Sequence, residues 1–381
     1  MYSKQFWLLC CSNFLFTASF QMMIPELPDY LTSMGGQDYI GLIIAAFTLT
    51  AGLSRPFSGK LTDTIGRVPI MAVGSLVCCV CSLFYPFMTG IWAFLLLRLV
   101  HGFSTGTKPT ATSAYVIDII PANRRGEASG MLGLFTATGM SIGPLVGSWL
   151  VAAFHIDVMF YVSSAFALIS ILILMQMKET LPNPQKFAFS QLKLKKQDLY
   201  EPTILPVFYV FVLASFASGV AITLTPLMSR GFGINKGLFF MIYTLASILI
   251  RLLASRVSDT RGRVPVLMVS CTVLAVSSIV FATATTPPVF YVASALFGLA
   301  WGLNSPTITA WTADLSTEHN RGRAMATMYI ALEAGIGIGA IVAGWLYNGQ
   351  LSSISASFYI SAGLSAAAVV YMFFYRKKVV N

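Results

Sequence analysis

The sequence predicts an all-α integral membrane protein with twelve transmembrane helices, arranged as two six-helix bundles around a central cavity. Of its 381 residues, 56% are hydrophobic and only 10% are charged, a balance typical of chains embedded in lipid. The ranges 264–313 and 334–375 contain no Asp, Glu, Lys or Arg. One motif also recurs at a fixed distance in the second half, which indicates a repeated architecture.

Each span is placed by its apolar run, because about 20 residues of helix cross a hydrocarbon core about 30 Å thick. Residues 5–25 are uncharged, too long for a signal-peptide core and not followed by a small-residue cleavage site, so they form the first span. An N-terminal bundle over 1–177, a polar cytoplasmic linker over 178–203 and a C-terminal bundle over 204–381 follow. The predicted spans are 6–27, 39–57, 69–89, 91–115, 127–152, 157–177, 204–228, 237–256, 264–284, 287–310, 323–347 and 353–375.

The formal net charge of +10 reflects topology rather than nucleic-acid binding. Twelve spans put both termini on one side, and 20 of the 24 Lys and Arg residues fall on that side. Arg230 and Lys236 lie on the opposite side, while Arg98 and Lys108 lie inside a span. The positive-inside rule makes both termini cytoplasmic. We expect a multi-pass protein of the bacterial cytoplasmic (inner) membrane whose basic side contacts anionic lipid.

No residue pattern indicates an enzyme, a cofactor or a metal site. All six cysteines fall within predicted spans without metal-ligand spacing, so we expect them to be packing residues. The short connections leave no room for a nucleotide-binding domain, and no Walker-type glycine loop occurs. Uphill transport would therefore draw on an ion gradient or on exchange, which predicts a secondary carrier.

The two halves align at an offset of 196 residues. GlyLysLeuThrAspThrIleGlyArgValPro at 59–69 matches SerArgValSerAspThrArgGlyArgValPro at 255–265. The same register pairs Asp118 with Asp314 and Trp149 with Trp345. Because each half holds an even number of spans, the repeat is parallel, with its axis along the membrane normal and a cavity between the halves.

These features resemble the major facilitator superfamily and, within it, the 12-span drug:proton antiporter (DHA1-like) family. Its signature loop between spans two and three is matched by one set of residues in the first half and by a weaker copy in the second. In the family this loop acts as a latch that holds the outward-facing state. The matching residues are Gly59, Asp63, Gly66 and Arg67, with Asp259, Gly262 and Arg263 as the copy.

Span four carries a polar face. Arg98 and Gly102 fit the family's Arg-x-x-x-Gly pattern, and a buried Arg should face protein or water because lipid disfavours its charge. At 100° per residue, the polar side chains fall within about 80° of one another. We expect this face to line the central cavity; the alternative is a structural pairing of Arg98 with Glu26 or with backbone carbonyls. The face comprises Arg98, His101, Thr105, Lys108 and Thr112.

Span five carries the Gly-x-x-x-Gly-Pro-x-x-Gly signature typical of antiporters in this superfamily, at Gly139, Gly143, Pro144 and Gly147. Glycines four apart let helices approach closely, and the proline bends the span. The resemblance implies export rather than uptake. Close packing alone is also compatible with the pattern.

Three titratable residues are candidates for proton coupling. Glu333 is the acid well inside a span of the second half, and its alternative role is a fixed partner for Arg98 or Lys108. Glu26 lies in a Pro-x-x-Pro ending of span one and is either an interfacial carboxylate or a gating or proton-carrying group. His101 either titrates near neutral pH or is a hydrogen-bonded packing residue.

The remaining cavity surface is expected from spans one, seven and ten. Asn13, Thr17 and Gln21 recur every four residues on span one, and Trp301 and Asn304 share a face of span ten. Polar and aromatic groups together suit flat, partly apolar molecules. For Trp301 the alternative is core or interfacial filling.

The leading hypothesis is a monomeric secondary transporter that exports small amphipathic compounds by alternating access in exchange for protons. The alternative is a carrier specific for an anionic metabolite, such as a sugar acid or a carboxylate-rich chelator, because one face of span four is cationic. A non-transporting membrane receptor is the third and weakest hypothesis. The expected partners are a small-molecule substrate, protons and membrane lipid.

Overall fold

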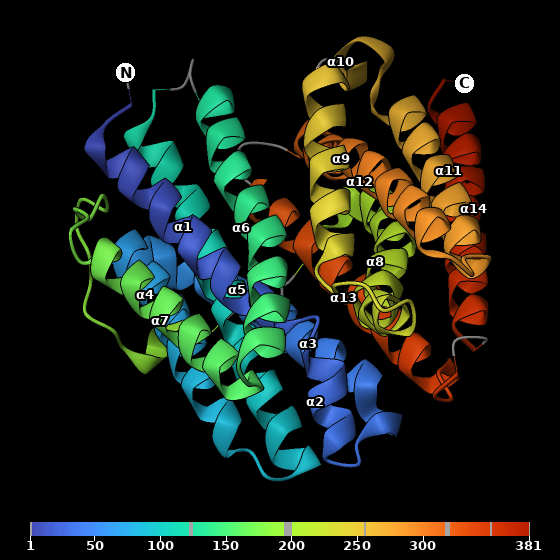
Figure 1. Cartoon of the computed structure of the whole chain (residues 1–381). Helices are drawn as coiled ribbons and strands as arrows, with labels where there is room; N and C mark the ends of the chain where they lie inside the picture. The colour runs from blue at the N-terminus through green and yellow to red at the C-terminus, as the bar shows by residue number, and fades with distance from the viewer. Residues whose placement is uncertain are drawn as a thin grey trace. The chain divides into compact units, whose positions relative to one another are not determined.

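The computed structural model describes residues 2–121, 125–193, 200–254, 257–316, 321–350 and 353–380. Over these ranges it contains twelve helices of 17 to 29 residues and, among the described residues, no strand (Figure 1). The long helices are α1 (Lys4–Met23), α3 (Ile40–Thr64), α4 (Arg67–Phe84), α5 (Ile91–Ile119), α6 (Arg125–Ala153), α7 (Ile156–Leu174), α8 (Leu205–Gly231), α9 (Leu238–Ala254), α11 (Arg263–Ala282), α12 (Pro287–Leu315), α13 (Arg321–Leu346) and α14 (Ile354–Val380).

The twelve predicted spans correspond one to one to these helices, which confirms the predicted fold class. Most boundaries agree within a few residues, but α3 continues to Thr64, seven residues beyond its predicted end. This extension carries the helix into the loop motif, where the next helix begins only three residues later. Two short helices, α2 (Leu27–Ser33) and α10 (Val257–Arg261), flank the long ones, with 3₁₀ turns at Gln37–Tyr39, Tyr85–Phe87, Phe189–Leu192 and Pro202–Ile204.

Nine of the described helical segments are long and apolar enough to cross a membrane, and α9 is a shorter apolar helix. Helices α5 and α12 are not among those nine, although each contains 29 residues, which is ample for a crossing. Helix α5 carries Arg98, His101 and Lys108, all fully buried within the protein. Helix α5 therefore turns these three polar side chains toward protein rather than lipid.

The chain forms two compact units. The first comprises Met1–Leu27 and Ala46–Asp198, and the second comprises Pro28–Ala45 and Leu199–Asn381. The segment 28–45, which includes α2 and the start of α3, therefore belongs by its contacts to the second unit. Its Gly41 packs against the backbone of Ala340 and Gly344 on α13, where no side chain would fit.

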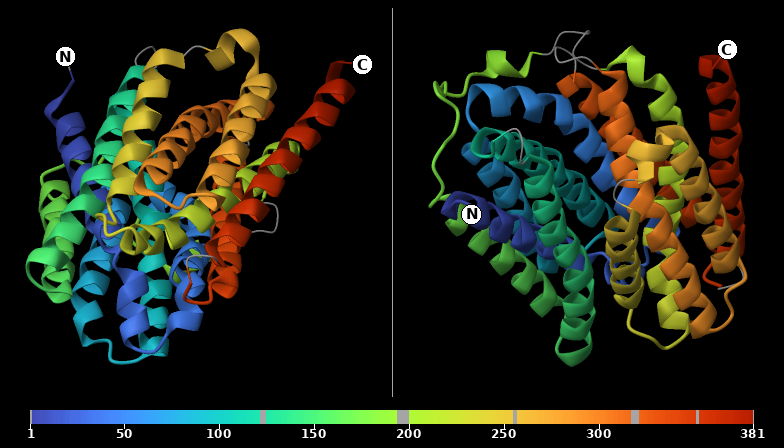
Figure 2. Two further views of the ribbon diagram at one scale, coloured as in Figure 1. Left: turned by 45° about the vertical axis from the view of Figure 1, so that its right-hand side comes forward. Right: turned by 90° about the horizontal axis from the view of Figure 1, so that it is seen from above.

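In the first unit, α1 packs against α6 and α7, and α4 packs against α5 and α7 (Figures 1 and 2). The second unit has the same pairings, with α8 against α13 and α14, and α11 against α12 and α14. The helices also keep the spacing of the sequence repeat, because α4 and α11, α5 and α12, and α6 and α13 each begin 196 residues apart. The two units are thus built to one plan.

Candidate transport site

The interior of the first unit contains two polar layers. Four helices, α1, α4, α5 and α7, each contribute buried polar residues seven positions apart, about two helical turns. One layer surrounds Lys108 and the other surrounds His101. The paired positions are Ser12 and Ser19 on α1, Ser75 and Ser82 on α4, His101 and Lys108 on α5, and Ser163 and Ser170 on α7.

In the first layer, the Lys108 side chain is completely enclosed. Its Nζ donates to the Oγ atoms of Ser170 at 2.6 Å, Ser12 at 3.0 Å and Ser75 at 3.0 Å, and to the Ser12 carbonyl oxygen at 3.1 Å. The ammonium position also lies 4.6 Å from the centroid of the Phe16 ring. The structure thus places Lys108 inside the first unit, among α1, α4 and α7.

The second layer links His101 to Arg98. The His101 Nδ1 lies 3.1 Å from the Tyr85 hydroxyl, to which Arg98 donates at 3.4 Å, and its Nε2 lies 3.3 Å from the Cys78 Sγ. The Arg98 guanidinium also stacks over Phe47, 4.5 Å from its ring centroid. Both basic side chains are fully buried, so the polar face of span four contacts protein over these two turns.

The other predicted residues of span four are also buried. Thr105 donates to the Gly102 carbonyl oxygen at 3.2 Å, and the Thr112 hydroxyl has no partner among the described residues. Gly102 itself packs on the Phe47 carbonyl of α3. In this conformation the polar face of α5 is enclosed, and its role as a cavity lining stays a prediction.

The glycine motif of span five forms the contact between α6 and α1. A Cβ at Gly139 would lie 2.9 Å from the Phe14 carbonyl oxygen, and one at Gly143 would lie 2.8 Å from that of Ala18. At Gly147 a Cβ would clash with the Met22 carbonyl. These three glycines therefore set the distance between the helices, and Pro144 lies between the last two, inside α6.

The predicted polar residues of α1 lie near this contact. Asn13 donates to the Thr136 Oγ1 of α6 at 2.6 Å, and the Thr17 Cβ lies against Gly139. Gln21 is buried, and its Oε1 has no hydrogen-bond partner among the described residues. The seam between α1 and α6 thus holds both the glycines and the polar stripe that the sequence singled out.

Trp301 and Asn304 lie one turn apart on α12 in the second unit. Trp301 is 6% exposed and packs near Phe211 and Phe297, with ring centroids 6.0 and 6.5 Å away. The amide of Asn304 donates to the Ser270 Oγ at 3.2 Å. The indole Nε1 and the Asn304 Oδ1 have no partner among the described residues, so this aromatic cluster has unsatisfied hydrogen-bonding capacity.

The two predicted acids differ in environment. Glu26 is 3% exposed and accepts a hydrogen bond of 2.7 Å from Ser148 on α6, so its carboxylate is buried within the first unit. Glu333 lies half-buried on α13, in the other unit. The proposed proton-carrying role of each stays a prediction.

The loop motif of the first half is tied by ion pairs and a helix cap. Arg67 pairs with Asp63 at 3.2 Å and, through Nε, with Asp118 at 3.0 Å. Gly66 has φ +132°, a conformation that favours glycine. The Glu179 carboxylate accepts from the backbone N–H groups of Arg67 and Val68, each at 3.0 Å, and so caps α4.

The second half keeps part of this arrangement. Arg263 pairs with Asp314 at 2.8 Å and donates to the Ser258 hydroxyl at 3.0 Å. Gly262 has φ +86°, as its counterpart in the first half also has a positive φ. The Asp259 side chain lies outside the described residues, and Gly59 has open space around its Cα.

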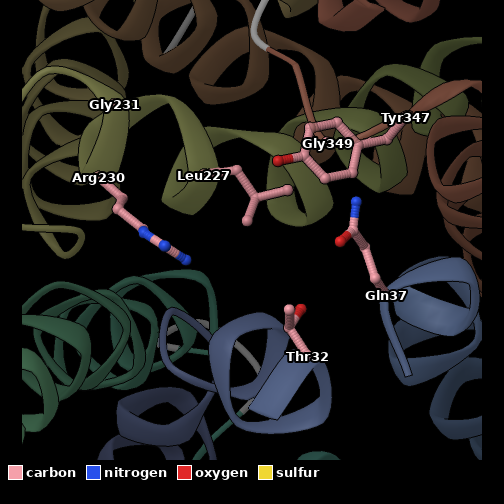
Figure 3. A pocket seen from close by; sticks show the side chains of 7 residues that line it. All are labelled: Thr32, Gln37, Leu227, Arg230, Gly231, Tyr347 and Gly349. Atoms are coloured by element: carbon pink, nitrogen blue, oxygen red, sulfur yellow. The ribbon is translucent and has the colours of Figure 1, made fainter. Parts of the chain in front are cut away.

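A small pocket of about 280 Å³ lies in the second unit, and none of the predicted site residues lines it. Figure 3 shows the side chains of Thr32, Gln37, Arg230 and Tyr347 directed toward a common space. Asp29 pairs beside it with Arg230 at 2.6 Å and with Lys236 at 2.5 Å. The pKa of Tyr347 lies above its ordinary value because burial raises it. The nearby Arg230 acts to lower this pKa, and Asp29 acts to raise it. The remaining lining residues are Leu227, Gly231 and Gly349.

The sequence profile of the Major Facilitator Superfamily matches residues 9–241 and 207–381. The chain belongs to the Major Facilitator Superfamily. It is therefore a multi-pass membrane transporter of small molecules and not an enzyme. The match covers both halves, in agreement with the repeat.

Curated relatives of this superfamily member include export and resistance proteins. It is 23% identical to the staphylopine export protein of Staphylococcus aureus (strain Mu50 / ATCC 700699) over 80% of this chain and 79% of that protein. It is 26% identical to multidrug resistance protein 2 of Bacillus subtilis (strain 168), over 64% of each chain. It is 27% identical to the quinolone resistance protein NorA of Staphylococcus aureus (strain MRSA252), over 56% of this chain and 57% of that one. The last two matches span less than two thirds of the relatives' lengths.

Solved structures share the fold of this superfamily member. The peptide transporter POT in complex with sulfate superimposes with a TM-score of 0.82 at 14% identity, over 99% of this chain and 95% of that one. The human organic anion transporter MFSD10 (TETRAN) gives a TM-score of 0.74 at 19% identity, over 97% and 98%. At these identities the likeness establishes the fold and not the substrate.

Several residues of the site were not predicted from the sequence. Asp118 and Asp314 were aligned by the repeat but were not assigned to the loop motif. Glu179 fell in the predicted linker, where nothing marked it as a helix cap. The serine layers had a detectable signal, because serines recur seven residues apart on the first, third and sixth spans, but that spacing gains meaning only once the helices are known to be neighbours.

Proposed function

We propose that this protein exports small amphipathic compounds across the bacterial cytoplasmic membrane in exchange for protons, working as a monomer by alternating access with both termini cytoplasmic. The observation that carries the proposal is the glycine contact between α1 and α6, because it gives a physical role to the antiporter signature of span five. Relatives named for drug resistance and export support the direction of transport.

The proposed cycle divides the chain into a bundle at 1–177 and a bundle at 204–381, joined by a cytoplasmic linker at 178–203. The loop motif around Arg67 would act as the latch between conformations. Substrate would contact the polar stripe of α1 and the aromatic cluster around Trp301, where the unsatisfied indole N–H and Asn304 oxygen can bond a polar group on a flat molecule.

Proton coupling in this proposal involves Glu333, with Glu26 and His101 as further candidates. Each pH unit across the membrane supplies about 1.4 kcal/mol per proton, and each 100 mV supplies about 2.3 kcal/mol per charge. One or two protons per cycle are therefore enough for a modest gradient of substrate. Membrane lipid surrounds the apolar outer faces of the helices.

A carrier of anionic metabolites is the second candidate function. The full burial of Arg98 beside Tyr85 and Phe47 gives the first unit a strong internal positive charge, and one solved neighbour is described as an organic anion transporter. This candidate predicts anionic substrates and no requirement for a proton gradient.

Accumulation of fluorescent probes in bacterial cells tests the direction and the charge class. We expect cells that express the protein to retain several-fold less ethidium (a cation) or norfloxacin (a quinolone) than cells with an empty vector, and the same amount of the anion fluorescein. Lower retention of fluorescein alone would favour the anion carrier, and higher retention of any probe would indicate uptake. An Arg98→Ala, Glu333→Gln double variant that exports every probe normally would overturn the site assignments.

A further inference from the structure

Lys108 is a buried basic group to which the proposed transport cycle assigns no role. Its side chain has no exposed surface, and its Nζ is surrounded by four oxygens within 3.1 Å. All four are neutral groups: three serine hydroxyls and one backbone carbonyl. Among the described residues, none of its partners is a carboxylate.

A charge without a counter-ion is costly in this setting. Buried charges in proteins are normally paired with an opposite charge, or the group loses its charge, and a Lys at the centre of a transmembrane helix costs at least about 2.5 kcal/mol. Unlike an arginine, a lysine can exist in a protein interior either with or without its proton. Lys108 and Arg98 lie ten residues apart on α5, nearly three helical turns, and only Lys108 can readily lose its proton.

The serine cage is suited to both forms of the amine. An ammonium needs three acceptors, which the four oxygens supply. A neutral amine has two N–H groups and one lone pair, and a serine hydroxyl can rotate to donate to that lone pair. Ser12 and Ser170 already contact each other at 2.8 Å, so the cage can exchange donor and acceptor roles without moving the backbone.

The groups that face Lys108 from the neighbouring helices are serine groups, a thiol and an aromatic ring. Lys108 is therefore the basic group of its layer. Helix α4 contributes the Cys78 thiol in addition to Ser75, and beyond Cys78 lies His101. Helices α1 and α7 contribute only serine groups and the Phe16 ring. Proton gain or loss at the amine is therefore not opposed or fixed by a nearby acid among the described residues.

The repeat provides a natural comparison. The position equivalent to Lys108 in the second half, 196 residues later, is Asn304. Asn304 is also buried on its helix and donates to a serine, Ser270, at 3.2 Å. An amide fills this place in the second unit with similar hydrogen bonding but without the ability to titrate. The titratable group is thus a property of the first unit.

We propose that Lys108 and the serines at positions 12, 75 and 170 form a proton-binding site whose amine gains and loses one proton during transport. The step is R–NH₃⁺ giving R–NH₂ and H⁺, with the proton passing to water on the side to which the site is open. Because Nζ is enclosed here, the exchange needs a conformation in which α5 separates from α1 or α7. This inference rests on the proposed proton-coupled transport.

Difference titration of the purified protein in detergent tests the site without any substrate. The measured quantity is the number of protons bound by the wild-type protein minus the number bound by Lys108→Asn. This difference should be larger by about one proton at pH 5 than at pH 9. Lys108→Arg, which retains the charge but not its exchange, should behave as Lys108→Asn does. Lys186→Asn, which removes an exposed lysine, should give a difference curve that is flat from pH 5 to pH 9. A flat curve for Lys108→Asn and Lys108→Arg as well would overturn the proposal.

Proton flux in proteoliposomes then tests the coupling. With ethidium and norfloxacin as probes, the flux per probe molecule should fall at least about tenfold in both Lys108 variants and stay unchanged in Lys186→Asn. If wild type moves protons and both Lys108 variants move them equally well with the same pH profile, the inference is wrong and the proposed function stands. If wild type moves none, the proposed function fails, whereas the titration still reports whether Lys108 exchanges a proton.

Discussion

Arg67 and Asp118 form an ion pair across 51 residues of sequence, and Arg263 and Asp314 repeat it at the same separation in the second half. The Nε–Oδ2 distances are 3.0 and 2.8 Å. In each half the arginine is the first residue of a long helix, at α4 or α11, and the aspartate is near the end of the following one. The pair therefore joins a helix start to a helix end in both units.

The two pairs should differ in strength because their exposure differs. The Arg67 and Asp118 side chains are 13% and 26% exposed, against 21% and 51% for the second pair. Asp118→Asn should lower the free energy of unfolding by about 1–2 kcal/mol and Asp314→Asn by about 1 kcal/mol or less. Thermal unfolding followed with a thiol-reactive dye, which reports exposure of the buried cysteines, measures both. Equal losses of unfolding free energy in the two variants would contradict the argument that the more buried ion pair is the stronger one.

The contact between α1 and α6 predicts that two glycines of α6 differ strongly in how their replacement by alanine affects stability and transport. Gly147→Ala places a methyl group against the Met22 carbonyl and should destabilise the protein by about 1–3 kcal/mol, with loss of transport. Gly130→Ala is the matched control, because nothing lies within 4 Å of its added Cβ, and it should be neutral or stabilising by up to about 1 kcal/mol. Unfolding temperature and ethidium export are the measurements; normal export by Gly147→Ala would contradict a tight seam.

Glu179 should matter more than a surface acid. Its carboxylate accepts four backbone hydrogen bonds, two from the start of α4 and two from Thr180 and Leu181. Glu179→Gln replaces one acceptor oxygen with a donor and should cost about 1–3 kcal/mol. Asp157→Asn, at an exposed pair with His155, is the control and should cost at most about 1 kcal/mol. Similar unfolding temperatures for the two variants would argue against the cap.

Acid should weaken the attachment of Glu201 to Arg323, which lie 2.7 Å apart. Burial raises the pKa of the Glu201 carboxyl, but hydrogen bonds from Arg323 and Thr203 together lower the pKa below its ordinary value. A lowered folded-state pKa means that the stabilisation is complete above the unfolded pKa, near 4.5, and is lost as pH falls through the folded value.

Glu201→Gln should therefore destabilise the protein by about 1–3 kcal/mol at pH 7 and flatten the loss of stability below about pH 4.5. Unfolding temperatures of wild type and variant from pH 3.5 to pH 7.5 give the result. Asp157→Asn serves again as the control. If the unfolding temperatures of wild type and Glu201→Gln stay parallel down to pH 3.5, the ion pair does not contribute to the loss of stability in acid.

The fold was accessible from the sequence because a bilayer imposes a simple rule. Charge-free stretches of span length and a repeat at one offset were enough to locate all twelve helices, and α5 and α12 begin at the residues predicted for them, Ile91 and Pro287. The end of α3 was missed because Lys60 and Asp63 look like loop residues, although helices extend into the headgroup region without apolar side chains.

The candidate site was harder to predict from the sequence than the fold, because a polar helical face can either line a cavity or pack against neighbouring helices. Arg98, His101 and Lys108 were expected to line the central cavity, yet in this conformation they are enclosed by Tyr85, Phe47 and three serines. Neither periodicity nor composition distinguishes a face that meets a cavity from one that meets neighbouring helices. Long-range partners such as Glu179 depend on the packing and leave no local pattern.

The most direct test of proton-coupled export is proton movement in proteoliposomes that contain a pH-sensitive dye, for wild type and Glu333→Gln, with ethidium, norfloxacin and fluorescein as probes. Wild type should change the internal pH when ethidium or norfloxacin is added, and the Glu333→Gln response should be at least about tenfold smaller. A response to fluorescein alone, or probe transport that is unaffected by collapse of the pH gradient, would contradict export in exchange for protons.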